Sequence, residues 1–348
     1  MKTSANAPLR CAVIGVGYLG NFHAQKFFQA EDVELVAVVD TSAERAAEIA
    51  AQYDCLGLTD YRALFAGGPN GSGAGEGDSQ AAARGERSCR VDAVSIVTPS
   101  DTHFQVATEC LEAGLHCLVE KPVTETVSEA EQLISLAEAR GRVLQVGHLE
   151  RFNPVVQTLK SYLDDPTWVE TYRLTPFRGR GVEVDVVLDL MIHDLDILLS
   201  LVASEVVDVQ ASGTCVVTDR IDVARARIRF ANGCVAELSA SRASPQPLRR
   251  TQVRQASGYI SVNYQDATVL VGGTGDDAAV EAGMRASFDV LNLERVDVLN
   301  AEILDFVSAI RLGRAPQVTG DDGLRALELA IRVSRTIAES ESARVAGV

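Results

Sequence analysis

The chain has 348 residues, with 48 acidic and 32 basic side chains and a formal net charge of −16 at pH 7. This length suits two domains. The 47% hydrophobic and 23% charged residues are typical of a globular protein. The negative charge repels polyanions, so we expect no nucleic-acid partner. No apolar run approaches the roughly 20 residues that span a bilayer, so we expect no membrane segment.

Seven cysteines are scattered singly through the chain, without the paired spacing of a zinc site. An odd, dispersed set fits the reduced thiols of a cytoplasmic protein better than a disulfide framework. The first residues lack the apolar core of a signal peptide. We therefore expect a cytoplasmic protein without a metal site.

Strands and helices alternate over residues 1–149. The sequence predicts strands at 10–16, 33–40, 92–97, 116–120 and 143–147. It predicts helices from the first glycine turn to about 30 and at 42–53, 101–113 and 128–140. Ser42 is a candidate N-cap, and Ser128 with Glu131 has the spacing of a capping box. The alternation predicts an α/β fold with a doubly wound parallel sheet, a Rossmann domain.

One stretch interrupts this alternation. Residues 67–88 are rich in Gly, Ser, Ala and Glu and carry too little apolar surface to offset the entropy of ordering them. We expect a mobile surface insertion at about 67–90. A lid over a binding site is the alternative.

The regular alternation of strands and helices ends after residue 149, and residues 150–348 predict a C-terminal α+β domain. Residues 223–230 and 234–240 alternate apolar and polar side chains around Asn232-Gly233, which indicates a hairpin. We expect an open, mainly antiparallel sheet that serves substrate binding and oligomerisation. Its further elements are predicted as strands at 169–174, 251–256, 259–263 and 268–271 and helices at 154–163, 186–201, 298–311 and 322–340.

Gly15-Val16-Gly17-Tyr18-Leu19-Gly20 follows the first strand and opens a helix, and Asp40 follows at the end of the next strand. This context is that of a dinucleotide-binding turn. Gly15 makes the turn, Gly17 lets the backbone approach a pyrophosphate, and Gly20 lets helix and strand pack closely. Asp40 would accept hydrogen bonds from ribose hydroxyls and repel a 2′-phosphate, which favours NAD over NADP. We include Tyr18 and Leu19 in this cofactor site; a plain glycine turn with a capping aspartate is the alternative.

Two more segments end strands at the same sheet edge, where ligands of open α/β sheets bind. Thr98, Pro99, Ser100 and His103 are candidate cofactor contacts, although Ser100 or Asp101 is equally suited to cap a helix. Glu120 and Lys121 precede Pro122. A lysine at this edge would approach the cofactor and favour a developing alkoxide, whereas the alternative is a surface lysine before a loop proline.

The strongest catalytic signal is in 189–196, where Asp189, His193 and Asp196 fall at i, i+4 and i+7 on one helical face. A carboxylate that orients an imidazole raises its basicity, as a general base near neutral pH requires. A single histidine among carboxylates does not suit zinc. The alternative is a buried, hydrogen-bonded histidine at a domain interface.

Polar residues also mark two candidate substrate segments. His148, Arg151 and Asn153 follow the last Rossmann strand, and polar groups there suit an interdomain ligand cleft; the alternative is a hinge with ordinary capping. Arg178 and Arg180 form a basic glycine-containing loop in an acidic protein. This loop suits a pyrophosphate or a uronate, or else is a solvated turn.

In this order the motifs resemble the Gfo/Idh/MocA oxidoreductase family, over nearly the whole chain. The resemblance rests on the glycine turn, 98–103, Glu120-Lys121-Pro122, the Asp189–His193 spacing and the ending at 302–321. It implies that Lys121 and His193 serve hydride transfer, that Asp189 lies near sugar hydroxyls, and that a sheet face packs a homodimer or homotetramer. Residues 67–88 have no counterpart in the family pattern, so that segment supports no argument about specificity.

Within the family, the glycine turn, 147–154 and 191–196 most resemble the nucleotide-sugar branch. That implies NAD-dependent oxidation of the 3-hydroxyl of UDP-N-acetylglucosamine, with the ketone passing to an aminotransferase in lipid A precursor synthesis. The alternatives are a dehydrogenase for another sugar, UDP-sugar acid or cyclitol, a reductase of a non-sugar compound, and a cofactor-binding regulatory protein without turnover.

Overall fold

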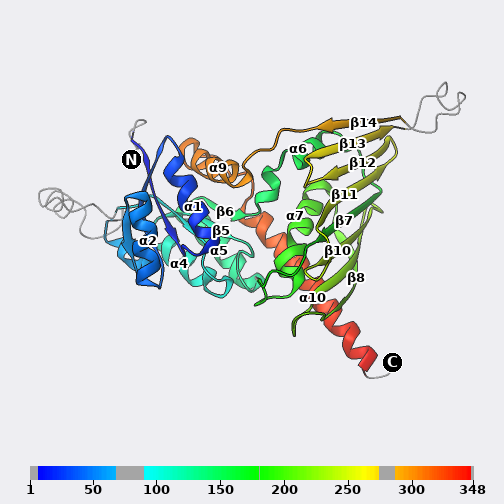
Figure 1. Cartoon of the computed structure of the whole chain (residues 1–348), viewed down its shortest axis with the longest axis horizontal. Coiled ribbons are helices and arrows are strands. Elements are labelled where there is room, and N and C mark those ends of the chain that lie inside the picture. The colour runs from blue at the N-terminus through cyan, green and yellow to red at the C-terminus, as the bar shows by residue number, and fades with distance from the viewer. Residues whose placement is uncertain (1–6, 68–89, 180, 274–286, 346–348) are drawn as a thin grey trace, which may run out of the picture. The chain divides into compact units, whose positions relative to one another are not determined.

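The computed structural model describes residues 7–67, 90–179, 181–273 and 287–345 (Figure 1). The predicted insertion at about 67–90 lies almost wholly outside this range, as does Arg180. The chain forms two compact units. Unit 1 comprises Met1–Leu149 and Asp297–Leu324, and unit 2 comprises Glu150–Val296 and Arg325–Val348. The first break coincides with the expected domain boundary, but 297–324 returns to unit 1.

Unit 1 is built on a six-stranded sheet in the order β3-β2-β1-β4-β5-β6, with every pair parallel. This is the doubly wound order, and the crevice where it reverses lies between β1 and β4. The strands are β1 Leu9–Ile14, β2 Val33–Val39, β3 Leu56–Leu58, β4 Ala93–Ile96, β5 His116–Glu120 and β6 Leu144–Gly147. The helices are α1 Tyr18–Gln29, α2 Ala43–Tyr53, α4 His103–Glu112, α5 Val127–Arg140 and α9 Val298–Leu312, with 3₁₀ turns at Tyr61–Gly67 and Ser100–Thr102.

The core of unit 1 joins distant parts of the chain. Cys11 and Val13 of β1 and Phe27 of α1 are fully buried, and Ile303 and Phe306 of α9 pack into the same cluster. Because α9 lies nearly 300 residues after β1 in the chain, no local pattern predicts this contact. Its apolar face completes the Rossmann core, and this explains why 297–324 belongs to unit 1.

Helix caps agree with the sequence in one case and correct it in another. Ser42 caps α2 as predicted, its side chain accepting from the Arg45 N–H at 3.2 Å. The capping box of α5, however, joins Thr126 and Glu129, so the prediction of Ser128 and Glu131 was wrong. Both spacings occur in the sequence; the helix begins at Val127, and this selects the earlier pair.

Unit 2 is built on an eight-stranded sheet in the order β14-β13-β12-β11-β7-β10-β9-β8. It is antiparallel except for the parallel pair β7–β10. The predicted hairpin is confirmed as β9 and β10, with Gly233 at φ +90° in its turn. The strands are β7 Trp168–Leu174, β8 Val206–Thr214, β9 Val223–Phe230, β10 Val235–Ser241, β11 Leu248–Gln255, β12 Gly258–Asn263, β13 Thr268–Gly273 and β14 Ser287–Asn292.

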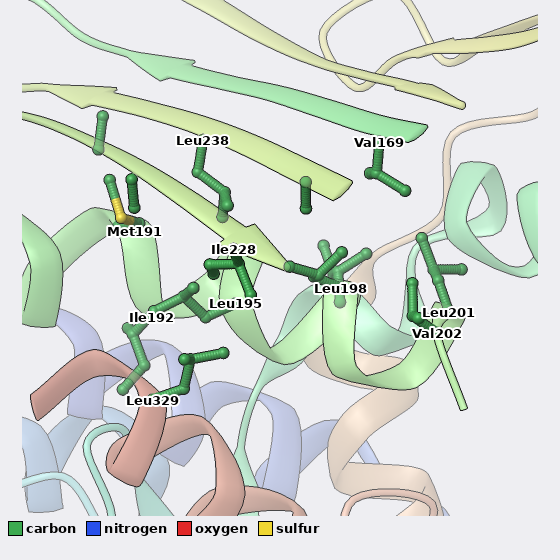
Figure 2. Packing of buried hydrophobic residues seen from close by; sticks show 14 of the residues in the cluster. Val169, Met191, Ile192, Leu195, Leu198, Leu201, Val202, Ile228, Leu238 and Leu329 are labelled. Carbon is green, nitrogen blue, oxygen red and sulfur yellow. The ribbon is translucent and has the colours of Figure 1, made fainter. Parts of the chain in front are cut away.

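Helices cover one face of this sheet (Figure 1). They are α6 Pro154–Ser161, α7 Ile192–Leu201 and α10 Gly320–Val345, whose residues from Arg325 onward belong to unit 2. Figure 2 shows Leu195 and Leu198 of α7 packed against Ile228 and Leu238 of the sheet, with Leu329 of α10 nearby. Along β9 the side chains alternate between this buried layer and the other face.

Three strands and one helical irregularity differ from the sequence predictions. Strands β3, β8 and β14 were not predicted; β3 has only three residues, and β8 buries only Val209. The predicted helix at 186–201 is divided into a π-helical turn, Val187–Met191, and α7. Single π turns within helices are frequent at functional sites.

Candidate active site

The glycine turn between β1 and α1 has the geometry that its sequence predicts. Gly15 has φ +85°, and a Cβ there would lie 2.7 Å from the Val97 carbonyl oxygen. A Cβ at Gly20 would lie 1.8 Å from the Gly15 carbonyl oxygen, so only glycine lets α1 pack this closely on the turn. Space is open around Gly17. The backbone there is accessible to a phosphate group.

Asp40 is fixed beside this turn by two backbone donors. Its Oδ2 accepts from the Val16 N–H at 3.1 Å and its Oδ1 from the Ser42 N–H at 3.0 Å. Each carboxylate oxygen has a further lone pair for a ribose hydroxyl. Arg45, which the sequence reasoning missed, donates to the Val16 carbonyl oxygen at 2.8 Å and holds the turn from the other side.

A cavity of about 730 Å³ opens over the carboxyl edge of the unit 1 sheet. Among the predicted cofactor residues, its lining includes Gly15, Gly17, Asp40, Thr98 and Pro99. Tyr18 and Leu19, at the start of α1, are exposed, and Ser100 begins the 3₁₀ turn before α4. The lining also includes residues that the sequence reasoning missed: Thr41, Thr59, Tyr61, Arg62, Thr102 and Gln105.

His103 is buried beneath this edge. Its Nδ1 lies 2.8 Å from the Pro122 carbonyl oxygen and its Nε2 lies 2.9 Å from the Thr98 carbonyl oxygen. The ring therefore connects the segment after β4 to the segment after β5. This placement gives His103 a part in shaping the cofactor edge; direct contact with the cofactor stays a prediction.

Glu120 ends β5 and is 5% exposed. Its Oε2 accepts from the Lys121 N–H at 3.1 Å, and its Oε1 lies 3.2 Å from His23 Nε2. Burial opposes ionisation of this carboxyl, but His23 and the Lys121 ammonium outweigh it and lower the pKa of Glu120. A Cβ at Gly147 would lie 2.9 Å from the Glu120 carboxyl atoms, so this glycine makes room for them.

Within the described part of the chain, His23, Glu120 and Glu302 form one group that could hold a metal ion, with ligand atoms within 4.8 Å of one another. Glu302 is fully buried on α9, and its pKa is raised well above the ordinary value by burial and then by Glu120 and Asp305. A protonated carboxyl is a poor metal ligand. We therefore interpret the group as a buried acid beside the contact of His23 with Glu120, and the absence of a metal site stays a prediction.

In unit 2, Asp189 lies in the π turn and His193 in the first turn of α7. A Cβ at Gly181, which has φ +68°, would lie 2.6 Å from Asp189 Oδ2, so the Asp189 carboxylate packs against bare backbone. Asp196 does not join them. Arg151 Nε donates to both Asp196 oxygens, at 3.1 and 2.9 Å, in a buried ion pair. Arg151 therefore engages both Asp196 oxygens, and a shared polar site of Asp189 and His193 stays a prediction.

A second buried ion pair fixes α7 to the sheet. Arg173 of β7 donates to both oxygens of Asp194 at 3.0 and 2.9 Å and to Glu150 Oε1 at 3.0 Å. Burial alone would lower the pKa of Arg173, but Asp194 and Glu150 reverse this and raise it. These bonds hold Asp194, the residue next to His193, so the start of α7 is fixed to β7.

Unit 2 has a cavity of about 400 Å³ beside Asp189. It is lined by Asp189 and by the cationic side chains of Arg178, Arg242 and Arg249. Arg242 is buried and donates to the carbonyl oxygens of Gly181 and Val184 at 2.6 and 2.8 Å, so it fastens the loop beside Asp189. A carboxylate and guanidinium groups in one cavity suit a ligand with both hydroxyls and negative charge.

Residues 9–148 match the model of an oxidoreductase family with an NAD-binding Rossmann fold, GFO/IDH/MocA, and residues 159–261 match the GFO/IDH/MocA C-terminal domain. The chain belongs to the Gfo/Idh/MocA family. It is therefore an oxidoreductase with NAD as its cofactor, and the glycine turn, Asp40 and the cavity over them fit that cofactor.

Named relatives extend this match. The chain is 41% identical to UDP-N-acetylglucosamine 3-dehydrogenase of Acidithiobacillus ferrooxidans, over 93% of this chain and 96% of that protein. A solved structure of that enzyme aligns with a TM-score of 0.82 at 39% identity, covering 95% of this chain and 98% of the other. Myo-inositol 2-dehydrogenase of Thermotoga maritima is 25% identical over 97% of this chain and 98% of that protein.

Two of the remaining predicted substrate residues of this Gfo/Idh/MocA protein have partners within the fold. Arg151 is occupied by Asp196, and Asn153 is the N-cap of α6, accepting from the Val155 N–H at 3.2 Å and donating to Glu150 at 3.0 Å. These contacts hold both side chains within unit 2, and substrate binding by either of them stays a prediction. His148 is buried in unit 1, and Arg178 lines the cavity of unit 2.

Proposed function

We propose that this protein oxidises the 3-hydroxyl of UDP-N-acetylglucosamine to the 3-keto sugar nucleotide, with NAD as the acceptor. The main structural support for this proposal is the unit 2 cavity, which combines the Asp189 carboxylate with arginine side chains suited to a sugar phosphate. The similarity to UDP-N-acetylglucosamine 3-dehydrogenase over nearly the whole of both chains supports the same substrate.

The reaction removes a hydride from C3 of the sugar and a proton from its hydroxyl, and NAD supplies the hydride acceptor. In our proposal His193 accepts the proton, and the Lys121 ammonium stabilises the alkoxide as it forms. Asp189 orients the reacting hydroxyl by accepting a hydrogen bond from it or from its neighbour. Glu120 holds the backbone of Lys121, and the buried pair of Arg173 and Asp194 holds α7 beneath His193.

The ketone product suits transamination, so we propose that an aminotransferase consumes it in lipid A precursor synthesis. We place the reaction in the cytoplasm, in keeping with the thiols of Cys11, Cys110, Cys117, Cys215 and Cys234, none of which forms a disulfide. None of the described helices is long and apolar enough to cross a membrane.

We also propose that the protein is a homodimer or homotetramer that packs through the sheet face opposite the helices. That face has a hollow lined by Tyr172, Arg225 and Glu237, with charges of both signs that suit a self-complementary contact. Light scattering on the protein as it elutes from a size-exclusion column measures the mass of the assembly. The mass of a single chain would contradict this proposal.

The activity is tested by incubating the protein with NAD and a panel of UDP-sugars and free polyols while the formation of NADH is followed by its near-ultraviolet absorbance, which NAD lacks. A ketone trap or an aminotransferase belongs in the assay, because oxidation of a secondary alcohol by NAD runs uphill at neutral pH. Turnover confined to UDP-N-acetylglucosamine is the expected result. Turnover only with a cyclitol, another sugar or a UDP-sugar acid would show that this compound, and not UDP-N-acetylglucosamine, is the substrate. NAD binding without any turnover would favour the regulatory function.

A further inference from the structure

Among the arginines of the unit 2 cavity, Arg249 makes only one long ion pair within the fold, whereas Arg242 is fastened by two hydrogen bonds. Arg249 is the second residue of β11, and its side chain is 44% exposed. It lines the same cavity as Asp189, Arg178 and Gln265. A guanidinium placed in this way can reach a ligand without leaving its position in the sheet.

The carboxylates near Arg249 neutralise its positive charge only in part. Its Nη1 lies 3.7 Å from Glu150 Oε1, beyond hydrogen-bond distance, and that oxygen already accepts from Arg173 at 3.0 Å. Asp194, the other nearby carboxylate, gives both of its oxygens to Arg173. Burial, together with repulsion from Arg173, lowers the pKa of Arg249. A bound anion would offset both effects.

We propose that Arg249 is the side chain that binds the diphosphate of the nucleotide-sugar substrate. This inference rests on the function proposed above. The planar guanidinium can donate two parallel hydrogen bonds to phosphate oxygens. Arg178 lines the same cavity, while the charge of Arg242 is buried beside Asp222. The two positive charges of Arg249 and Arg178 match the two negative charges of a diphosphate better than the single charge of a uronate.

Arg249 would therefore distinguish UDP-sugars from the other substrates of the family. A free cyclitol carries no group that pairs with Arg249, so binding it would leave the guanidinium partly buried and still uncompensated. A UDP-sugar supplies the missing anion, while Asp189 in the same cavity accepts from the sugar hydroxyls. Affinity for the UDP portion alone should therefore depend on Arg249.

The test measures binding of UDP to the whole protein by calorimetry, without turnover. Replacement Arg249→Gln leaves a shorter, polar side chain without the charge, and we expect UDP to bind roughly 10- to 100-fold more weakly. Arg249→Lys should recover part of this loss. The matched control is Arg250→Gln: the next residue of β11 points to the opposite face of the sheet, so UDP affinity should change by about twofold at most.

Equal UDP affinity in the wild type and Arg249→Gln would overturn the proposal, as would equal losses in Arg249→Gln and Arg250→Gln. Dependence on Arg249 for glucuronate but not for UDP would show a carboxylate site instead. Circular dichroism and thermal unfolding check that each variant is folded. If UDP binds through Arg249 while UDP-N-acetylglucosamine is not oxidised, the proposed function fails and this inference stands. If Arg249→Gln oxidises that sugar with an unchanged KM, the inference fails alone.

Discussion

Replacing Glu302 by Gln should make the protein more stable than the wild type as the pH rises. The Glu302 carboxyl is fully buried, and neither of its oxygens has a hydrogen-bond partner among the described residues. Its pKa is raised well above the ordinary 4.5, first by burial and then by repulsion from Glu120 and Asp305. The folded protein therefore keeps this proton at pH values where the unfolded chain has lost it.

The sign of the effect follows from this difference in bound protons. Below about pH 4.5 both states hold the proton, so Glu302 contributes no pH dependence. Above that pH only the unfolded state releases it, and the free energy of unfolding falls by about 1.4 kcal/mol per pH unit until the pH passes the folded-state pKa. Glutamine does not titrate. Between pH 5.5 and 7.5 the advantage of Glu302→Gln over the wild type should grow by up to about 3 kcal/mol.

Urea unfolding at pH 5.5, 6.5 and 7.5, followed by circular dichroism, measures this difference. Glu302→Met is the companion variant: it also lacks a titrating group, so its difference from the wild type should have the same slope with pH but a different offset. A difference that is constant with pH, or that grows toward acid, would refute the assignment of a protonated buried Glu302.

Three further predictions concern the site and its support. His193→Asn should lower turnover by roughly 10²- to 10⁴-fold with NAD affinity retained; near-normal turnover would remove His193 from the proposed chemistry. Arg173→Met should lower the free energy of unfolding by about 3–5 kcal/mol, because Asp194 and Glu150 stay buried without their cation; an unchanged unfolding midpoint would contradict that role. Asp40→Asn should weaken NAD binding and narrow its advantage over NADP, measured by titrating each cofactor; an unchanged ratio would exclude Asp40 from the ribose site.

The parts of this protein that its sequence predicted are those in which neighbouring residues act together. The glycine turn requires small residues at Gly15 and Gly20, because each nearly touches backbone carbonyl atoms. The hairpin of β9 and β10 follows from alternation and a tight turn. These features lie within a few residues of one another in the chain, so their spacing alone carries the information.

The features that sequence reasoning missed depend on residues far apart in the chain. Glu302 meets Glu120 and His23 only because the apolar face of α9 completes the Rossmann core. Arg249 enters the cavity because β11 pairs on one side with β7, a strand far away in the sequence. The pairing of Asp196 with Arg151 and the π turn at Asp189 are likewise set by packing. The sequence by itself determined the Rossmann turn, the α/β class and the residues available for chemistry. Only the tertiary structure decided which charges are neutralised within the fold and which line a cavity, because burial and partner choice arise when distant segments pack.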